Sequence, residues 1–144
     1  MRLIAAMLGL MLIIGLAPSA DATHYMKHRE YRAKTIKLPH CGDSKVLKKI
    51  SRKFAWAEHH TWGTNWTIDS LTNARLRYNN FNGPSMIAHR HCRATAWLSN
   101  GQRRTVIYRV ENRMGFAGFG WNVSFCVSGL DRHRVYGANC QSLR

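Results

Sequence analysis

The fold is decided by the stretch from residue 89 to residue 140, and above all by its first half. Residues 89–98 read His-Arg-His-Cys-Arg-Ala-Thr-Ala-Trp-Leu, and residues 103–111 read Arg-Arg-Thr-Val-Ile-Tyr-Arg-Val-Glu, with Ser-Asn-Gly-Gln between them. Apolar and polar residues alternate along both stretches, as in strands that bury one face. The sequence therefore predicts an antiparallel hairpin at the centre of the domain.

The turn of this hairpin decides which residues share a face. A two-residue Asn-Gly turn would place Leu98 opposite Arg103, which mixes charged and apolar residues on one side. A three-residue loop with Gly101 in the left-handed conformation places Cys92 opposite Tyr108 and keeps each face uniform. Because a slip of one residue turns a whole strand over, we use the burial pattern to choose the register. The three-residue loop is predicted.

This register separates an apolar face from a basic one. The apolar, inner face is predicted to comprise Cys92, Ala94, Ala96, Leu98, Val106, Tyr108 and Val110. The outer face is predicted to comprise His89, His91, Arg93, Thr95, Trp97, Arg103, Thr105, Ile107, Arg109 and Glu111.

The rest of the chain predicts one helix and further strands. Asp43 or Ser44 is a suitable N-cap, and an apolar stripe follows at helical spacing: Val46, Leu47, Ile50, Phe54 and Ala57. Residues 59–63 end the helix. Residues 67–78 are predicted as a strand with loose apolar spacing, residues 79–84 as a loop, and residues 121–127 as a strand that turns Trp121, Val123, Phe125 and Val127 to one side. The fold class is α+β, with an N-terminal helix packed on a four- to five-stranded antiparallel meander.

Two glycine-bearing segments complete the meander. In residues 115–120, glycines alternate with phenylalanines, which we expect to enter the core while the glycines permit a tight turn. Residues 127–137 are predicted to form a second hairpin.

The four cysteines predict two disulfides, for which three pairings are possible. The second hairpin is centred midway between Cys126 and Cys140, so these two should face each other. Cys41, just before the helix, is then left to pair with Cys92 on the inner face. No Cys-x-x-Cys pair is present, and we predict neither a metal nor a cofactor.

The N-terminal residues predict export. Residues 1–22 have the features of a signal peptide, namely Arg2, an apolar run and small residues before a cleavage site ahead of Thr23. We expect a periplasmic or secreted protein with no transmembrane segment after cleavage, a flexible basic arm at residues 23–40, and a single disulfide-bonded domain at residues 41–144.

The charge favours anionic partners. The formal net charge is +15, and cleavage of the leader would remove one residue of each sign. We predict a non-enzymatic module that binds lipopolysaccharide, an anionic glycan or lipid, or nucleic acid. A protein partner is also considered. The predicted binding residues are Lys45, Lys48, Lys49, Arg52 and Lys53 on the helix and Arg93, Trp97, Arg103 and Arg109 on the sheet.

Two alternatives belong to other classes. His89, His91 and Glu111 would share the outer face, where they could hold a metal or perform acid–base hydrolysis of nucleic acid or glycan. Arg93 and Arg109 flank this group, and their charge opposes a bound cation. The other alternative is an enzyme inhibitor that presents the loops at residues 116–119 or 79–84. We predict no catalytic residue.

Several short motifs resemble those of a group of proteins. These motifs are Cys41-Gly-Asp, His91-Cys-Arg-Ala94, Gly115-Phe-Ala-Gly118, Phe125-Cys-Val127 and Gly129-Leu-Asp131. From about Leu38 to Arg144 the chain resembles small uncharacterised exported proteins of Gram-negative bacteria, a resemblance that implies no site residues. The order of elements is also similar to cystatin-like and NTF2-like folds, in which a helix rests on a curled antiparallel sheet, and this similarity concerns the fold alone.

Overall fold

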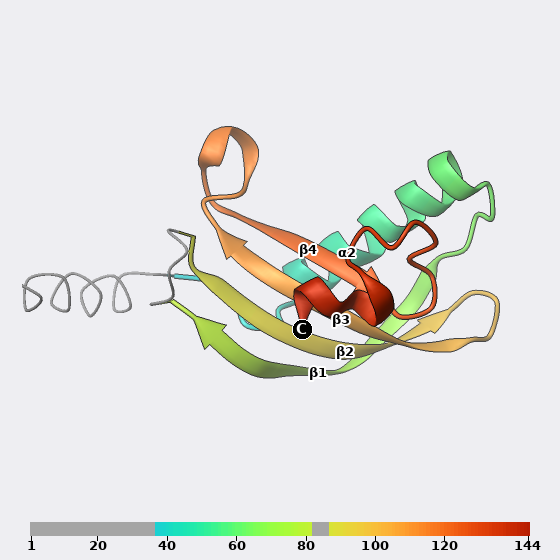
Figure 1. Ribbon diagram of the computed structural model, residues 1–144, viewed down its shortest axis with the longest axis horizontal. Coiled ribbons are helices and arrows are strands. Elements are labelled where there is room, and N and C mark those ends of the chain that lie inside the picture. Colours follow the sequence, from blue (N-terminus) through green and yellow to red (C-terminus); the bar gives the residue numbers. More distant parts are fainter. Residues whose placement is uncertain (1–36, 82–86) are drawn as a thin grey trace, which may run out of the picture.

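The computed structural model describes residues 37–81 and 87–144, so the predicted signal peptide and most of the predicted arm lie outside the described residues. Helix α2 (Ser44–Ala57) continues into a π-helical turn (Glu58–Trp62) and is followed by strands β1 (Ile68–Asn80), β2 (His89–Leu98), β3 (Arg103–Asn112) and β4 (Trp121–Val127). Short 3-10 segments lie at Phe116–Gly118 and Ala138–Leu143. The predicted α+β class is confirmed: one helix packs on a four-stranded antiparallel sheet (Figure 1).

The sheet is a meander with the strand order β1-β2-β3-β4. Cys92 pairs with Tyr108, as the three-residue loop requires, and the amide of Leu98 donates to the Gln102 carbonyl at 3.0 Å. Gly101 has a φ of 78°, the left-handed conformation that this loop needs. The predicted register is confirmed, and all seven predicted inner-face residues are buried.

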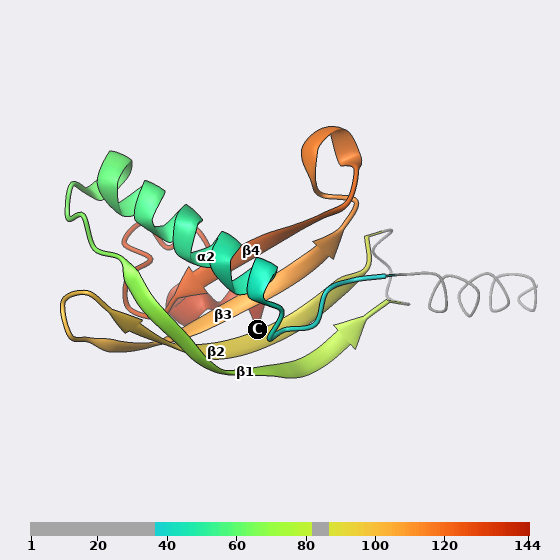
Figure 2. The same ribbon diagram turned by 180° about the vertical axis from the view of Figure 1, so that it is seen from behind.

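Helix α2 closes the inner face. The N-cap is Asp43, whose carboxylate accepts a hydrogen bond from the Lys45 amide at 2.8 Å. Val46, Ile50 and Phe54 are buried against the sheet, and Figure 2 shows α2 lying across it. The helical run ends at Gly63, whose φ of 65° turns the chain away from the helix axis.

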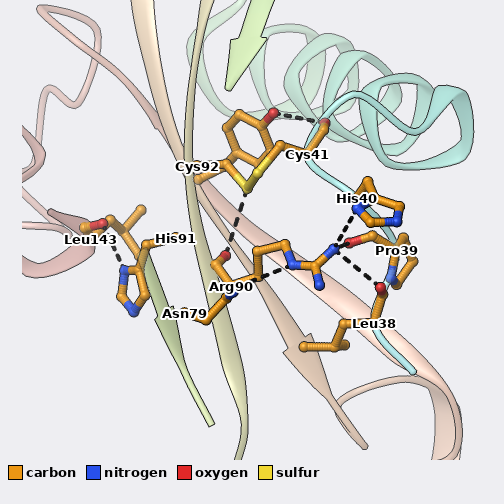
Figure 3. The surroundings of a disulfide bond; sticks show 10 residues. Leu38, Pro39, His40, Cys41, Asn79, Arg90, His91, Cys92 and Leu143 are labelled. Atoms are coloured by element: carbon orange, nitrogen blue, oxygen red, sulfur yellow. Dashed lines mark hydrogen bonds between the residues drawn. A yellow bond between two sulfur atoms is a disulfide. The ribbon is translucent and has the colours of Figure 1, made fainter. Parts of the chain in front are cut away.

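The predicted disulfide between Cys41 and Cys92 ties the start of α2 to the sheet, with a Cα–Cα distance of 5.8 Å (Figure 3). Beside it, the buried Tyr108 hydroxyl donates to the Cys41 carbonyl at 2.8 Å. The guanidinium of Arg90 donates to the carbonyls of Leu38 and Pro39 at 3.2 and 2.8 Å. Leu38 itself is buried in the core, so part of the segment predicted as a flexible arm is packed against the domain.

Strand β1 is irregular, as its loose apolar spacing suggested. Its pairing with β2 shifts register at three places, and Asn73 has a φ of 53° beside one of them. The strand runs to Asn80, so the first two residues of the loop predicted at 79–84 belong to the sheet. Residues 82–84 of that loop lie outside the described residues.

The C-terminal segment partly covers the outer face. Ile107, Cys126, Cys140 and Leu143 form a small buried cluster there, and the predicted Cys126–Cys140 disulfide lies within it. The predicted hairpin at 127–137 is wrong. Residues 128–137 form successive turns in which the Asp131 carboxylate accepts hydrogen bonds from the amides of Val135 and Tyr136, so these amides are not available for strand pairing.

Candidate functional site

The predicted binding residues lie on two opposite faces of the sheet. One group, the helix surface, is carried by α2 on the inner side: Lys45, Lys48, Lys49, Arg52 and Lys53. The other group, the sheet surface, lies on the outer side at the end of β2 and β3: Arg93, Trp97 and Arg103. The structure therefore does not join the two sets into one site, and a flat ligand could contact only one of them at a time.

The helix surface contains two kinds of cation. The side chains of Lys45, Lys48 and Arg52 are exposed and form no hydrogen bond or ion pair within the described residues. Lys49 and Lys53 instead reach across to β4, although Lys53 stays exposed as a residue. Both lie close to the sheet because they occupy the flank of the helix beside the β4 edge.

The contacts of these two lysines are with backbone carbonyls of β4. The ammonium of Lys49 donates to the Trp121 carbonyl at 3.4 Å and lies 4.9 Å from the centre of the Trp121 ring. That of Lys53 donates to the Val123 carbonyl at 2.9 Å and to the Asn122 side chain at 3.1 Å. Burial and the neighbouring Lys49 lower the pKa of Lys53.

The sheet surface pairs an exposed indole with guanidinium groups. The Trp97 side chain is 44% exposed, and the guanidinium of its cross-strand partner Arg103 lies 5.8 Å from the ring centre. Further along β2, Arg93 is exposed and stands opposite Arg75 of β1, which the sequence analysis did not include. Trp97 keeps one part of its ring accessible for stacking.

Arg109 is separate from the sheet surface. Its guanidinium forms an ion pair with the buried Glu111 carboxylate at 2.7 Å, and the Ser124 hydroxyl donates to the same carboxylate at 2.8 Å. Arg109 therefore stabilises a buried acid, and its charge is largely compensated. Its prediction as a binding residue stays untested, but its position favours a structural role.

His89, His91 and Glu111 come together as predicted, but they are covered by other residues. All three are buried, and the Nε2 atom of His89 lies 3.9 Å from the Glu111 carboxylate. The C-terminal segment covers His91, whose Nδ1 atom lies 3.3 Å from the Leu143 carbonyl, and the Tyr78 ring stacks on its imidazole. The expectation of an accessible outer face is therefore wrong at this group.

Most acidic side chains in the described part of the chain hold local structure and contact no cation. The carboxylates of Asp43 and Asp131 accept from backbone amides, and those of Glu58 and Asp69 accept from threonine hydroxyls. Within residues 37–81 and 87–144, Arg109 is the one Lys or Arg that forms an ion pair with a carboxylate. The remaining Lys and Arg side chains stay without an acidic partner.

The loop between β3 and β4 differs from its prediction. Phe116 and Phe119 were expected to enter the core, yet their side chains are 95% and 79% exposed. The two rings belong to a turn that projects beyond the ends of the strands (Figure 1). No sequence signal distinguishes the two outcomes, because a phenylalanine beside glycines is compatible with either burial or exposure.

A cleft of about 250 Å³ lies between the end of α2 and the turns that follow β4. Its walls are mostly apolar and include Phe54, Trp62 and Tyr136. Its acidic side chains already have partners, since Glu58 accepts from the Thr64 hydroxyl and Asp131 accepts from two amides. The two carboxylates of the cleft therefore stabilise the local fold.

No group of three His, Cys, Asp or Glu side chains in the described residues is arranged to hold a metal ion. In the same residues, no helix has the length and apolarity needed to cross a membrane. Comparison with protein-family models, curated proteins and solved structures found no match to this chain. Its function must therefore be argued from its own surfaces.

Proposed function

We propose that this protein is a non-enzymatic binding module that engages an anionic partner of the cell envelope or its surroundings, chiefly through the helix surface. The observation that supports this most strongly is the use of the acidic side chains. Four of the five described carboxylates are bound to amides or hydroxyls, so the exposed cations are not neutralised by the acidic side chains that the structure describes. A polyanion would neutralise them and release its own counterions.

The helix surface is the better candidate of the two. Its five cations lie on one helix within nine residues, and four of them, Lys45, Lys48, Arg52 and Lys53, are exposed. Lys49 and Lys53 extend the positive surface to the edge of β4. The sheet surface provides fewer cations and an indole, which suits a secondary contact by stacking.

The two disulfides support an oxidising compartment, because such bonds persist outside the reducing cytosol. A periplasmic or secreted location is the finer proposal, and it rests on the leader-like residues 1–22. Lipopolysaccharide, anionic lipid and acidic glycan are the polyanions that a protein would meet there.

The test is the salt dependence of binding by the chain from Thr23 onward. For a linear polyanion such as duplex DNA or an acidic glycan, log affinity should fall linearly with log salt concentration. Replacing Lys45, Lys48 and Arg52 together by glutamate should flatten this slope by about two to three. These side chains have no partner within residues 37–81 and 87–144, so the fold should be retained.

A matched variant controls for net charge. Replacing Arg75, Arg93 and Arg103 by glutamate changes the charge equally but on the opposite face. If both variants lose affinity to the same extent, the helix surface is not the chief contact. A wild-type slope near zero would refute the polyanion proposal altogether.

A further inference from the structure

The loop that joins β3 to β4 presents an apolar tip outside the body of the protein. Within residues 113–120, Phe116 is 95% exposed, Phe119 is 79% exposed and Met114 is 42% exposed. Figure 1 shows this loop as a coil that stands clear of both the sheet and α2. Two exposed phenyl rings three residues apart on one short loop are unfavourable in water, which makes a partner for them expected.

The backbone holds these rings outside. The amide of Gly118 donates to the Gly115 carbonyl at 3.2 Å, and that of Phe119 donates to the Phe116 carbonyl at 3.0 Å. Ala117 and Gly118 both have positive φ values, 51° and 79°. At Gly115 an added Cβ would lie 1.9 Å from the Phe119 carbonyl oxygen, so only glycine allows the chain to close on itself.

The surroundings of the tip are positively charged. No Asp or Glu occurs between Glu111 and Asp131, and Arg113 is exposed at the base of the loop. Trp121 directly follows the loop, and the Lys49 ammonium lies over its ring. The N-terminal half of the helix surface therefore adjoins the base of the apolar tip.

We infer that the partner is an anionic lipid bilayer, into whose interfacial region Phe116 and Phe119 insert while the cations of the helix surface contact the headgroups. This inference rests on the proposed function and names its partner. Apolar side chains at a tip, flanked by Lys and Arg, are the combination that binds bilayer surfaces, because burial of the rings adds to attraction by anionic lipid.

A bilayer suits the shape of this tip better than a folded protein does. A stable protein–protein interface buries about 800 Å² on each partner, which requires a broad complementary surface. The loop's exposed apolar side chains are Phe116, Phe119 and the less exposed Met114, which are too few to form such a surface. A lipid surface needs no such complementarity, because its headgroups and chains rearrange around the inserted side chains.

The experiment measures partition of the chain from Thr23 onward into vesicles of phosphatidylglycerol and phosphatidylcholine, at several salt concentrations. Wild-type protein should bind these vesicles, and pure phosphatidylcholine vesicles much less. Phe116→Ser combined with Phe119→Ser should reduce the partition coefficient by about tenfold or more. The salt slope should stay unchanged, because no charge has been altered.

Two further variants keep the result interpretable. Phe116→Leu with Phe119→Leu keeps the tip apolar and should bind within about threefold of wild type. Leu76→Ser with Val135→Ser removes exposed apolar side chains, 50% and 72% exposed, away from the loop, and should leave binding unchanged. Circular dichroism and disulfide mapping confirm that each variant is folded.

The outcomes separate this inference from the proposed function. If the serine variant binds vesicles as tightly as wild type, insertion is refuted while salt-dependent binding still supports a polyanion. If wild type binds duplex DNA or an acidic glycan but not vesicles, the lipid inference fails and the proposed function stands. If it binds none of these, both fail.

Discussion

The two faces of the sheet are closed by different means. On the inner face, α2 contributes a row of apolar side chains, and the Cys41–Cys92 disulfide joins residues 51 positions apart. On the outer face, a short C-terminal segment covers a small cluster, and the Cys126–Cys140 disulfide spans 14 positions. The inner face is therefore closed by packing that a sequence pattern can specify, whereas the outer face is closed by local contacts.

The largest effect on stability is expected from removal of the disulfides. Replacing Cys41 and Cys92 by alanine should lower the free energy of unfolding by about 4 kcal/mol, and replacing Cys126 and Cys140 by about 3 kcal/mol, because the longer loop restricts the unfolded chain more. Urea unfolding of the two double variants measures both values. A larger loss for Cys126 and Cys140 would show that the outer closure contributes more than its loop length suggests.

A smaller effect on stability is expected from a cavity made on either face of the sheet. Ile50→Ala should lower the free energy of unfolding by about 3 kcal/mol, because the fully buried side chain leaves a cavity that the helix and sheet cannot fill. Leu143→Ala should cost about 2 kcal/mol, since the end of the chain can relax around the missing atoms. Thermal or urea unfolding provides the comparison.

Leu143→Ala has a second readout. The Leu143 backbone covers His91, so loosening of the segment should let water reach the imidazole. The pKa of His91, followed by NMR, should then rise toward the ordinary value, whereas Ile50→Ala should leave this pKa unchanged. Equal effects of the two variants on His91 would mean that the two faces do not open independently.

The inner face could be predicted because one pattern determined it. Alternation along residues 89–111, one turn and the helical stripe after Asp43 together specified the register and the two faces, with Cys92 on the inner one. The pairing of Cys41 with Cys92 followed by elimination, once Cys126 was paired with Cys140. The second pairing, Cys126 with Cys140, was predicted correctly from a hairpin that does not form. Close sequence spacing between these cysteines allowed either backbone path to bring them together.

The candidate sites could be predicted only in part. Residue types identified the cations of the helix surface, but not the contacts that Lys49 and Lys53 make with carbonyls of β4. The coverage of His91 depends on Tyr78 and Leu143, which come from distant parts of the chain and show no shared periodicity. The exposure of Phe116 depends on backbone conformation, and a phenylalanine beside glycines is compatible with either burial or display.

The smallest effect is expected from pH, and it concerns the outer face alone. Burial lowers the pKa of His89 and His91 below the ordinary value of 6.5, and the neighbouring Arg109 acts in the same direction. Glu111 opposes both shifts, and the Leu143 carbonyl opposes that of His91.

The sign of the effect follows from the lowered pKa values. Below pH 6.5, His89 and His91 bind protons more readily in the unfolded chain than in the folded one. The free energy of unfolding should therefore be constant above this pH and fall below it. Urea unfolding between about pH 7.5 and 5.5 measures this while carboxylates remain mostly ionised. His91→Gln should reduce the dependence, and replacing the exposed His133 by glutamine should not. Stability that rises as the pH falls through this range would mean that the histidines gain a partner on protonation, and that the outer face is closed by charge rather than by burial.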